Sequence, residues 1–197
     1  MTKIGVFGRP PRPGQVKTRL IPSIGAENAT RVYQHCLEHA LKICAEADYP
    51  FQLFLTALSN DHIFAGITSD LQQGENLGER MYHALSNMLS GNTSAMIIGS
   101  DCLDMSTTRL IQAAEALEDH DLVLIPAIDG GYALIGCRRI DLELFQSVKW
   151  STDEVLTQTL KNAERLNYRV CLLESVRDID TLHDLEHYPQ LLELIDP

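Results

Sequence analysis

The sequence predicts an α/β protein in which a largely parallel sheet is layered with helices. One observation leads to this class, and a second leads to the number of domains. Short apolar runs alternate along the chain with longer segments that have helical spacing. No internal repeat, low-complexity tract or linker-like stretch interrupts the 197 residues. We therefore expect residues 1–197 to form a single domain.

Strands are predicted where a short apolar run ends at glycine, proline or polar residues. The first is KIGVFG, which stops at Gly8 and a group of prolines. The others cover residues 51–58, 67–71, 94–101, 121–127, 132–137 and 168–173. Because ligands of open α/β sheets bind at the carboxyl ends of strands, the loops to inspect are 9–19, 73–77, 100–105 and 126–131.

Helices are predicted where apolar residues recur at intervals of three and four. Over residues 26–47 one apolar stripe is formed by Val32, Cys36, Leu37, Ala40, Leu41 and Cys44. Further helices are expected over 77–89, 106–118, 151–165 and 180–194, with a weaker one before 67. Ser106, the Ser151/Glu154 pair and the Thr181/Asp184 pair have the spacing of N-terminal caps.

Composition excludes several classes of protein. With 27 acidic and 16 basic residues, the chain has a formal charge of −11, which argues against a nucleic-acid partner. No apolar run approaches the ~20 residues that span a bilayer, and no signal peptide precedes the first strand. We expect a cytoplasmic protein without a membrane partner. The five cysteines form no CxxC pair, so buried thiols are expected rather than disulfides or zinc.

The loop RPPRPGQVKTRL concentrates positive charge in this acidic chain. Five basic residues precede the first carboxylate, Glu27: Lys3, Arg9, Arg12, Lys17 and Arg19. The prolines restrict the backbone, and Gly14 allows main-chain N–H groups to approach an anion. Lys17 and Arg19 are two residues apart, so on an extended segment both would face the same side. The loop is predicted to bind phosphate; the alternative is a solvated charged loop.

This loop is not a Walker A motif. In that motif a glycine directly precedes the Lys-Ser/Thr pair and a helix begins there. Here Val16 precedes Lys17, and Pro22 is expected to prevent a helix soon after Leu20.

Six blocks occur in the order PRPGQVKTRL, QGENLGERM, GSDC, DGGYALIG, KWST and DIDTLHDL. Together they resemble a bacterial group of radical-SAM/selenodomain-associated, or arsenosugar-biosynthesis, glycosyltransferases. The resemblance covers nearly the whole chain. It implies the three-layer GT-A fold of nucleotide-diphospho-sugar transferases, with a mostly parallel central sheet flanked by helices. The block from Lys17 to Leu20 is more distantly similar to that of 2-phospho-lactate guanylyltransferases, which share this fold.

Asp101 ends the apolar run MIIGSD and is thus expected at the tip of a strand. The resemblance implies that it holds a divalent metal, Mg²⁺ or Mn²⁺, which bridges the phosphates of a nucleotide. By the same resemblance Asp180 in DIDTLHDL is the second metal carboxylate. One or two carboxylates together with phosphate oxygens suit Mg²⁺. The alternatives are a turn-forming role for Asp101 and a helix cap at Asp180.

The remaining candidates divide into two groups. Phosphate or nucleotide binding is expected of Arg9, Gly14, Lys17, Arg19, Gln73, Asn76 and Arg80. Acceptor or sugar binding is expected of Asp129, Gly130, Gly131, Trp150, Ser151 and Thr152. For Asp129 and Gly130 a plain β-turn is the alternative, and Trp150 also suits the core. Arg9, Arg12, Asn76, Leu103 and Leu182 depart from the family pattern.

These observations predict a metal-dependent transferase that uses a nucleotide-activated donor and a small-molecule acceptor. Glycosyl transfer from a nucleotide sugar is the preferred reaction. In it, Lys17, Arg19 and a metal at Asp101 neutralise charge on the leaving phosphate. Asp129 orients or deprotonates the acceptor hydroxyl. Nucleotidyl transfer with release of pyrophosphate and non-catalytic nucleotide binding remain alternatives. The base, the sugar, the acceptor and the oligomeric state are not inferred.

Overall fold

The computed structural model describes residues 1–195, within which seven strands form one sheet. The order of the strands is β3 (Ser69–Leu71), β2 (Phe51–Leu55), β1 (Thr2–Gly8), β4 (Ser94–Ile98), β6 (Tyr132–Cys137), β5 (Leu122–Pro126), β7 (Val170–Leu172). Strand β6 is antiparallel to β4 and β5, and the other neighbouring pairs are parallel. The predicted fold, a mostly parallel sheet flanked by helices, is confirmed.

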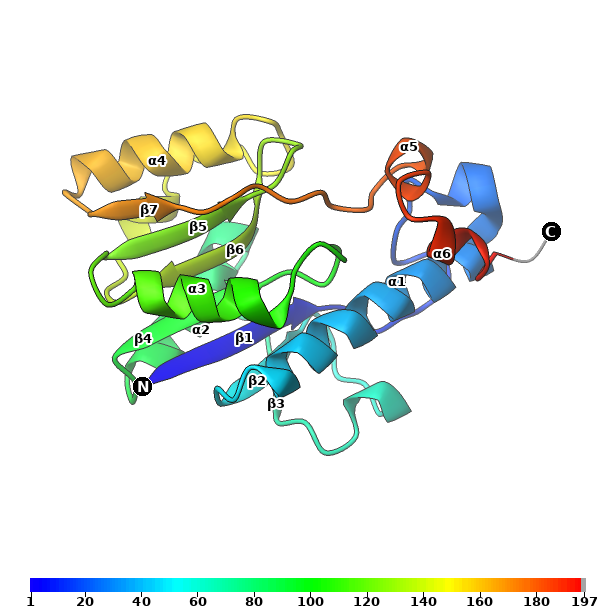
Figure 1. Ribbon diagram of the computed structural model, residues 1–197, viewed down its shortest axis with the longest axis horizontal. Helices are drawn as coiled ribbons and strands as arrows, with labels where there is room; N and C mark the ends of the chain where they lie inside the picture. Colours follow the sequence, from blue (N-terminus) through cyan, green and yellow to red (C-terminus); the bar gives the residue numbers. More distant parts are fainter. Residues whose placement is uncertain (196–197) are drawn as a thin grey trace.

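Helices cover both faces of the sheet (Figure 1). One face packs against α1 (Ile21–Glu46) and α3 (Thr107–Ala116). The other packs against α2 (Leu77–Leu89), α4 (Val155–Arg165) and the 3₁₀ turn η2 (Leu142–Phe145). A second 3₁₀ turn, η1 (His62–Phe64), lies between β2 and β3. Two short helices, α5 (Leu182–Leu185) and α6 (Pro189–Leu192), pack against the first half of α1.

Strand β4 shows why the apolar runs form this sheet. All five residues of SAMII are buried. Because side chains alternate along a strand, Met96 and Ile98 pack in the cluster with α1 and α3, while Ala95 and Ile97 pack in the cluster with α2 and α4. A continuous apolar run is thus the pattern of a strand that is covered on both faces.

Two predicted helix starts differ from the structure. Helix α1 begins at Ile21 with a short turn that contains Pro22, where the missing N–H costs no hydrogen bond, but Gly25 has non-helical angles (φ = 79°, ψ = 163°), and the regular helix follows it from Ala26 as predicted. Pro22 therefore does not prevent a helical turn after Leu20, contrary to the expectation, although this turn is separated from the rest of α1 by the kink at Gly25. Helix α4 begins only at Val155 and has no side-chain cap. Ser151 has φ = 64° and lies before the helix, so the predicted Ser151 capping box is wrong.

The predicted C-terminal helix over 180–194 is in fact the pair α5 and α6. Thr181 and Asp184 form the predicted capping box at the start of α5. Pro189 then starts α6, and because proline lacks an N–H it cannot continue the preceding helix.

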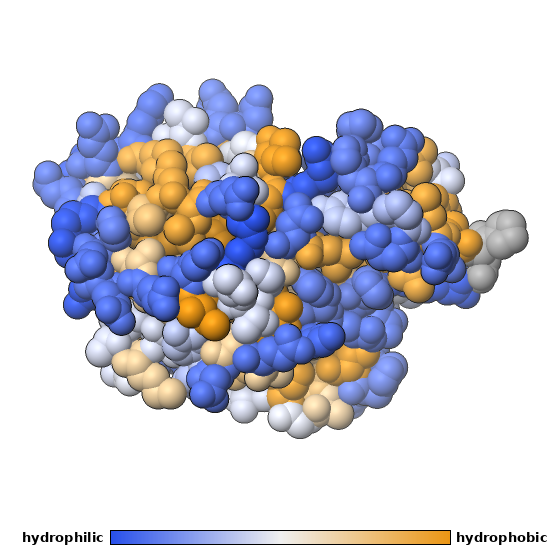
Figure 2. Space-filling view, viewed as in Figure 1, coloured by the Kyte–Doolittle hydropathy of each residue, from blue (hydrophilic) through white to orange (hydrophobic). Residues whose placement is uncertain are grey.

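Within residues 1–195 no helix is both long enough and apolar enough to cross a bilayer. Figure 2 shows hydrophilic residues over much of one face, with smaller hydrophobic areas between them.

Candidate functional site

A cavity with a volume of about 460 Å³ lies beyond the carboxyl ends of β1 and β4. Four segments supply most of its wall: the end of β1 with Arg9, the loop 15–19, the residues 99–101 after β4, and Asp180 before α5. Tyr33, Thr56, Gln72, Leu77, Arg80, Trp150 and Ser151 complete it. The cavity therefore lies where strand ends of an α/β sheet bind ligands.

Lys17 connects the two predicted metal carboxylates. Its Nζ lies 2.5 Å from Asp101 Oδ1 and 3.1 Å from Asp180 Oδ1. The lysine side chain is 2% exposed, whereas those of Asp101 and Asp180 are 44% and 40% exposed. Burial alone would lower the pKa of Lys17, but the charges of Asp101 and Asp180 outweigh burial and hold the pKa above its usual value. Lys17 is therefore a buried ammonium with two carboxylate partners.

The backbone of residues 13–20 forms turns rather than an extended segment. Lys17 has a left-handed backbone conformation with φ = 46°, and its carbonyl accepts from the Leu20 N–H at 2.9 Å. This turn directs Lys17 inward, while Arg19 remains 64% exposed. The expectation that both share one face of an extended segment is wrong. Arg19 Nη1 nevertheless lies 3.6 Å from Asp180 Oδ2.

Tyr33 on α1 holds the start of the same loop. Its hydroxyl accepts from the Arg9 N–H at 2.6 Å and donates to the Arg9 carbonyl at 3.1 Å. Ser100 Oγ lies 3.2 Å from the same hydroxyl. Burial of this side chain is the main cause of its raised pKa. One buried phenol thus connects the loop after β1 with the loop after β4.

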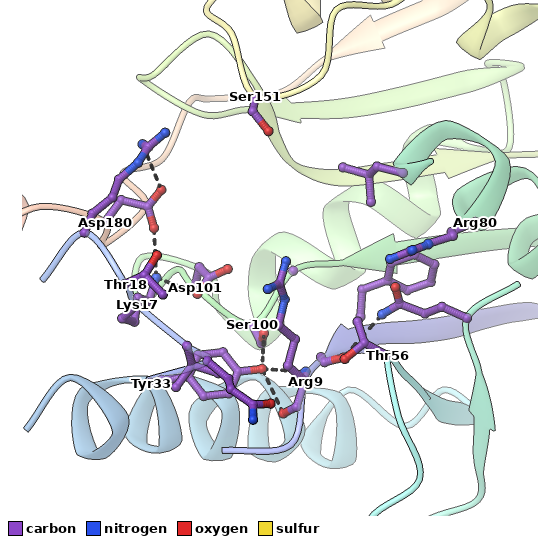
Figure 3. Close-up of a pocket in the computed structure, with 18 of the residues that line it drawn as sticks. Arg9, Lys17, Thr18, Tyr33, Thr56, Arg80, Ser100, Asp101, Ser151 and Asp180 are labelled. Carbon is purple, nitrogen blue, oxygen red and sulfur yellow. Dashed lines mark hydrogen bonds and ion pairs between the residues drawn. The ribbon is translucent and has the colours of Figure 1, made fainter. Parts of the chain in front are cut away.

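The opposite end of the cavity is formed by Thr56, Gln72 and Arg80 (Thr56 and Arg80 are labelled in Figure 3, across the cavity from Lys17 and Asp180). Gln72 Nε2 donates to the carbonyls of Gly8, at 3.3 Å, and Phe54, at 3.0 Å. Because both partners are acceptors, they fix the amide nitrogen on that side. Gln72 Oε1 has no hydrogen-bond donor among the described residues and remains an acceptor at the cavity wall.

The cavity brings together eight of the predicted site residues: Arg9, Lys17, Arg19, Arg80, Asp101, Trp150, Ser151 and Asp180. Seven are not among its lining residues: Gly14, Gln73, Asn76, Asp129, Gly130, Gly131 and Thr152. Gln73 instead lines a second cavity of about 160 Å³ beside α2. Asn76 is the N-cap of α2, where its Oδ1 accepts from the Glu79 N–H at 3.0 Å.

The segment from Asp129 to Gly131 forms the turn between β5 and β6. Asp129 Oδ1 accepts from the Gly131 N–H at 3.0 Å. Gly130 has φ = 94°, and a Cβ at this position would overlap the backbone of Asp153. The positive φ and this close approach explain Gly130 without a ligand, whereas a Cβ at Gly131 would meet only the Asp129 side chain, at 3.3 Å.

Trp150 combines the two roles considered for it. Its ring packs against Phe145 with centroids 6.1 Å apart, and the residue also lines the cavity.

Thr152 Oγ1 donates to the Lys149 carbonyl at 2.8 Å and accepts from the Glu154 N–H at 3.3 Å. Thr152 is therefore part of the turn that leads into α4.

Asp178 is a neighbour of the site that sequence reasoning missed. The Ile179 N–H donates to the Asp101 carbonyl at 2.9 Å, so the segment that carries Asp178 and Asp180 runs beside Asp101. Burial, followed by the charges of Asp101 and Asp129, raises the pKa of Asp178 to about 7. The repeated aspartates of DID were the available sequence signal.

The two carboxylates fit a hard divalent cation. Asp101 and Asp180 already converge on one positive charge. Among the described residues no group of three or more His, Cys, Asp and Glu side chains is arranged to hold a metal. Mg²⁺ commonly takes one or two carboxylates and completes its shell with phosphate oxygens and water. The pair therefore suits a metal that is shared with a phosphorylated ligand.

Comparison with solved structures supports the fold. A proposed nucleotide-diphospho-sugar transferase from Desulfovibrio desulfuricans is 30% identical, with a TM-score of 0.88 over 93% of this chain and 84% of that one. A CMP:2-keto-3-deoxy-manno-octonic acid synthetase complexed with CTP is 10% identical, with a TM-score of 0.59 over 98% of each chain. The same values hold for a 4-diphosphocytidyl-2C-methyl-D-erythritol synthase from Anaerococcus prevotii. The last two show the fold alone.

No protein with a curated description matches the chain. A family model described as an uncharacterized protein conserved in bacteria, DUF2064, matches residues 31–152. The radical-SAM and arsenosugar associations stay predictions, because neither the family description nor the structural matches mention them. The matched residues make up more than half of the sequence, and the chain belongs to the DUF2064 family.

Proposed function

We propose that this protein is a transferase that uses a nucleotide-activated donor, with glycosyl transfer from a nucleotide sugar as its reaction. One observation carries the proposal: Lys17, Asp101 and Asp180 meet at one end of a cavity at the strand ends. The similarity to the Desulfovibrio desulfuricans protein supports the same reaction class.

The end of the cavity with Lys17 would bind the diphosphate. Lys17, Arg19 and Arg9 provide three cationic side chains along this wall, and charge-assisted hydrogen bonds to phosphate contribute about 1.5–3 kcal/mol each. Asp101 and Asp180 would hold Mg²⁺ or Mn²⁺, which supplies positive charge to the leaving phosphate. Tyr33 keeps the loop in place through Arg9, so little ordering entropy would be lost on binding.

The opposite end would bind the base. Nucleobases carry both N–H donors and acceptor atoms on their edges. Gln72 Oε1 offers an acceptor, Arg80 offers donors, and the exposed Thr56 hydroxyl offers either. Phe7 and Leu77 provide apolar contact surface in the same cavity. The nucleotide would therefore lie along the cavity, with its base at Gln72 and its phosphates at Lys17.

The sugar and acceptor would contact the wall that contains Trp150 and Ser151. Both residues line the cavity, and a tryptophan face suits stacking on a sugar ring. In Figure 3 Ser151 lies across the open space from Ser100 and Arg9. Asp129, the sequence-based candidate for activating the acceptor, is exposed and bonded within its own turn, so it gains no support as the base.

Nucleotidyl transfer is a second candidate, and the loop favours it. Three cationic side chains beside two carboxylates also suit a nucleoside triphosphate whose pyrophosphate leaves. The reaction differs from glycosyl transfer in its leaving group rather than in its binding site.

Product analysis tests the proposal. The protein is incubated with Mn²⁺, an acceptor panel and either sugar nucleotides or nucleoside triphosphates. Release of a free nucleoside diphosphate supports glycosyl transfer, and release of pyrophosphate supports nucleotidyl transfer. Asp101→Asn should abolish metal-dependent nucleotide binding in calorimetry, and Asp119→Asn, which alters an exposed residue in the turn after α3, is the matched control. Absence of nucleotide binding by the unaltered protein would contradict both reactions.

A further inference from the structure

The two carboxylates that suit a divalent metal already hold a cation of the protein itself. Lys17 Nζ contacts Asp101 Oδ1 at 2.5 Å and Asp180 Oδ1 at 3.1 Å. The lysine is almost completely buried, while both aspartates remain more than one-third exposed. The ammonium is therefore enclosed by the protein while both carboxylates line the cavity, with Arg19 Nη1 3.6 Å from the other oxygen of Asp180, Oδ2.

A metal ion bound by both aspartates would compete with this ammonium. Mg²⁺ binds carboxylate oxygens at about 2.0–2.1 Å and demands near-octahedral geometry. Asp101 Oδ1 and Asp180 Oδ1 both point to Lys17 Nζ, so a metal that used the same two atoms would occupy nearly the same place. Even at neighbouring positions, the two positive charges would repel each other in a partly buried setting.

Phosphate oxygens would resolve this competition. Lys17 has a flexible four-carbon stem with three donors on its nitrogen, and the cavity beside it has room for an anion. A phosphate that accepts from Lys17 removes the ammonium from the carboxylates and adds negative charge for the metal. The basic loop alone cannot do this, because its other cations only add positive charge.

We propose that Lys17 is the resident cation of the Asp101/Asp180 pair, so that a divalent metal binds together with a phosphate-bearing ligand and only weakly before it. The inference rests on the proposed function, since it concerns the metal of that same site. It assigns Lys17 two successive partners: the carboxylates in the free protein and the phosphates in the complex.

Mn²⁺ binding to the full chain without nucleotide tests this. Free Mn²⁺ is measured by electron paramagnetic resonance for the unaltered protein and for Lys17→Met, which keeps the length of the side chain but not its charge. We expect Lys17→Met to bind Mn²⁺ about tenfold more tightly, a modest figure for the removal of one unit charge at this distance. The double variant Lys17→Met/Asp101→Asn should lose the tighter Mn²⁺ binding that Lys17→Met alone shows. Lys42→Met, which removes an exposed lysine paired with Glu46 at 3.9 Å, should bind like the unaltered protein.

A second measurement adds pyrophosphate. Pyrophosphate should increase Mn²⁺ affinity more in the unaltered protein than in Lys17→Met. Only the unaltered protein has an ammonium that can move from the two carboxylates to the phosphate. If Lys17→Met does not fold, Lys17→Gln replaces it in the same titrations.

Two outcomes separate the inference from the proposed function. Equal or weaker Mn²⁺ binding by Lys17→Met, while the unaltered protein binds a metal–nucleotide complex, overturns the inference alone. Tighter Mn²⁺ binding by Lys17→Met, in a protein that binds no nucleotide, supports the resident cation and overturns the proposed function.

Discussion

The ammonium nitrogen of Lys17 lies 2.5 Å from Asp101 Oδ1, and this contact joins the loop after β1 to the end of β4. The lysine is the buried partner and the aspartate the half-exposed one. Loss of the aspartate therefore leaves a buried charge with less compensation, whereas loss of the lysine removes that charge.

The stability of variants should show this asymmetry. We expect Asp101→Asn to lower the free energy of unfolding by about 1–2 kcal/mol, less than for a fully buried pair because Asp101 is 44% exposed and solvent screens it. Lys17→Met should cost less than Asp101→Asn. Urea denaturation without metal measures both, and the reverse order would contradict the burial argument.

Removal of the Tyr33 hydroxyl should loosen the basic loop. Tyr33→Phe leaves the Arg9 N–H without its partner at 2.6 Å, which should cost about 1–2 kcal/mol of stability. Amide exchange at Arg9 should accelerate, and pyrophosphate affinity should fall. Tyr49→Phe is the control, because the Tyr49 hydroxyl has no hydrogen bond among the described residues. Unchanged exchange at Arg9 in Tyr33→Phe would argue against the anchoring role.

Two glycines with positive φ should respond differently to alanine. At Gly14, with φ = 79°, no atom lies within 4 Å of the added Cβ. Gly14→Ala should therefore lower the free energy of unfolding by about 1 kcal/mol, the cost of holding alanine at a positive φ. At Gly130 the Cβ also overlaps the Asp153 backbone, and a total of about 2–4 kcal/mol is expected. Thermal unfolding of the two variants measures the difference. Equal losses would mean that the turn moves freely away from Asp153.

Replacement of Gln72 should weaken the binding of nucleotides but not the binding of pyrophosphate. Gln72→Ala removes the acceptor at the base end, and we expect about a tenfold loss of affinity for a nucleoside diphosphate, the effect of one hydrogen bond of about 1.4 kcal/mol. Pyrophosphate affinity should remain unchanged. Gln73→Ala is the comparison, since Gln73 lines the other cavity. A larger loss of nucleoside diphosphate affinity in Gln73→Ala than in Gln72→Ala would favour Gln73, the residue predicted from the sequence, as the nucleotide contact.

Thiol reactivity should distinguish one cysteine from four. Burial raises the pKa of Cys36, Cys44, Cys102 and Cys137 to about 12. At pH 8 only about one in ten thousand of such thiols is the reactive thiolate. Cys171 is only half-buried, so Ellman's reagent should modify one thiol rapidly in the folded protein. The other four should react after unfolding, and rapid modification of Cys102 would show that the end of β4 opens.

The elements with regular patterns could be predicted from the sequence, and the details of their ends could not. Helix α2 begins and ends where its periodicity does, at Leu77 and Leu89. Asp101 was placed correctly after β4 because an apolar run ends there. Whether Gln72 or Gln73 lines the main cavity depends on how far β3 extends. A shift of one residue along a strand moves a side chain to the opposite face of the sheet.

Other parts of the site depend on backbone conformations without a sequence signature. Lys17 and Ser151 have positive φ although neither is glycine, and each side chain is directed by its turn rather than by alternation. The DID triplet marks Asp178 as an aspartate near Asp180, but its position beside the site follows from the approach of the segment 178–180 to Asp101. Such tertiary proximity cannot be read from spacing along the chain.

The attachment of α5 and α6 to the first half of α1 has a consequence for biosynthesis. During translation Lys17 and Asp101 leave the ribosome well before Asp180, and until then the apolar surface of Leu20, Val32 and Cys36 lacks its cover. A nascent chain that has already paired β1 with β4 would thus hold Lys17 and Asp101 together before Asp180, the second carboxylate partner, is available. Under the proposed function, the site would be complete only when the segment before α5 brings Asp180 to Lys17 and the last two helices cover this part of α1.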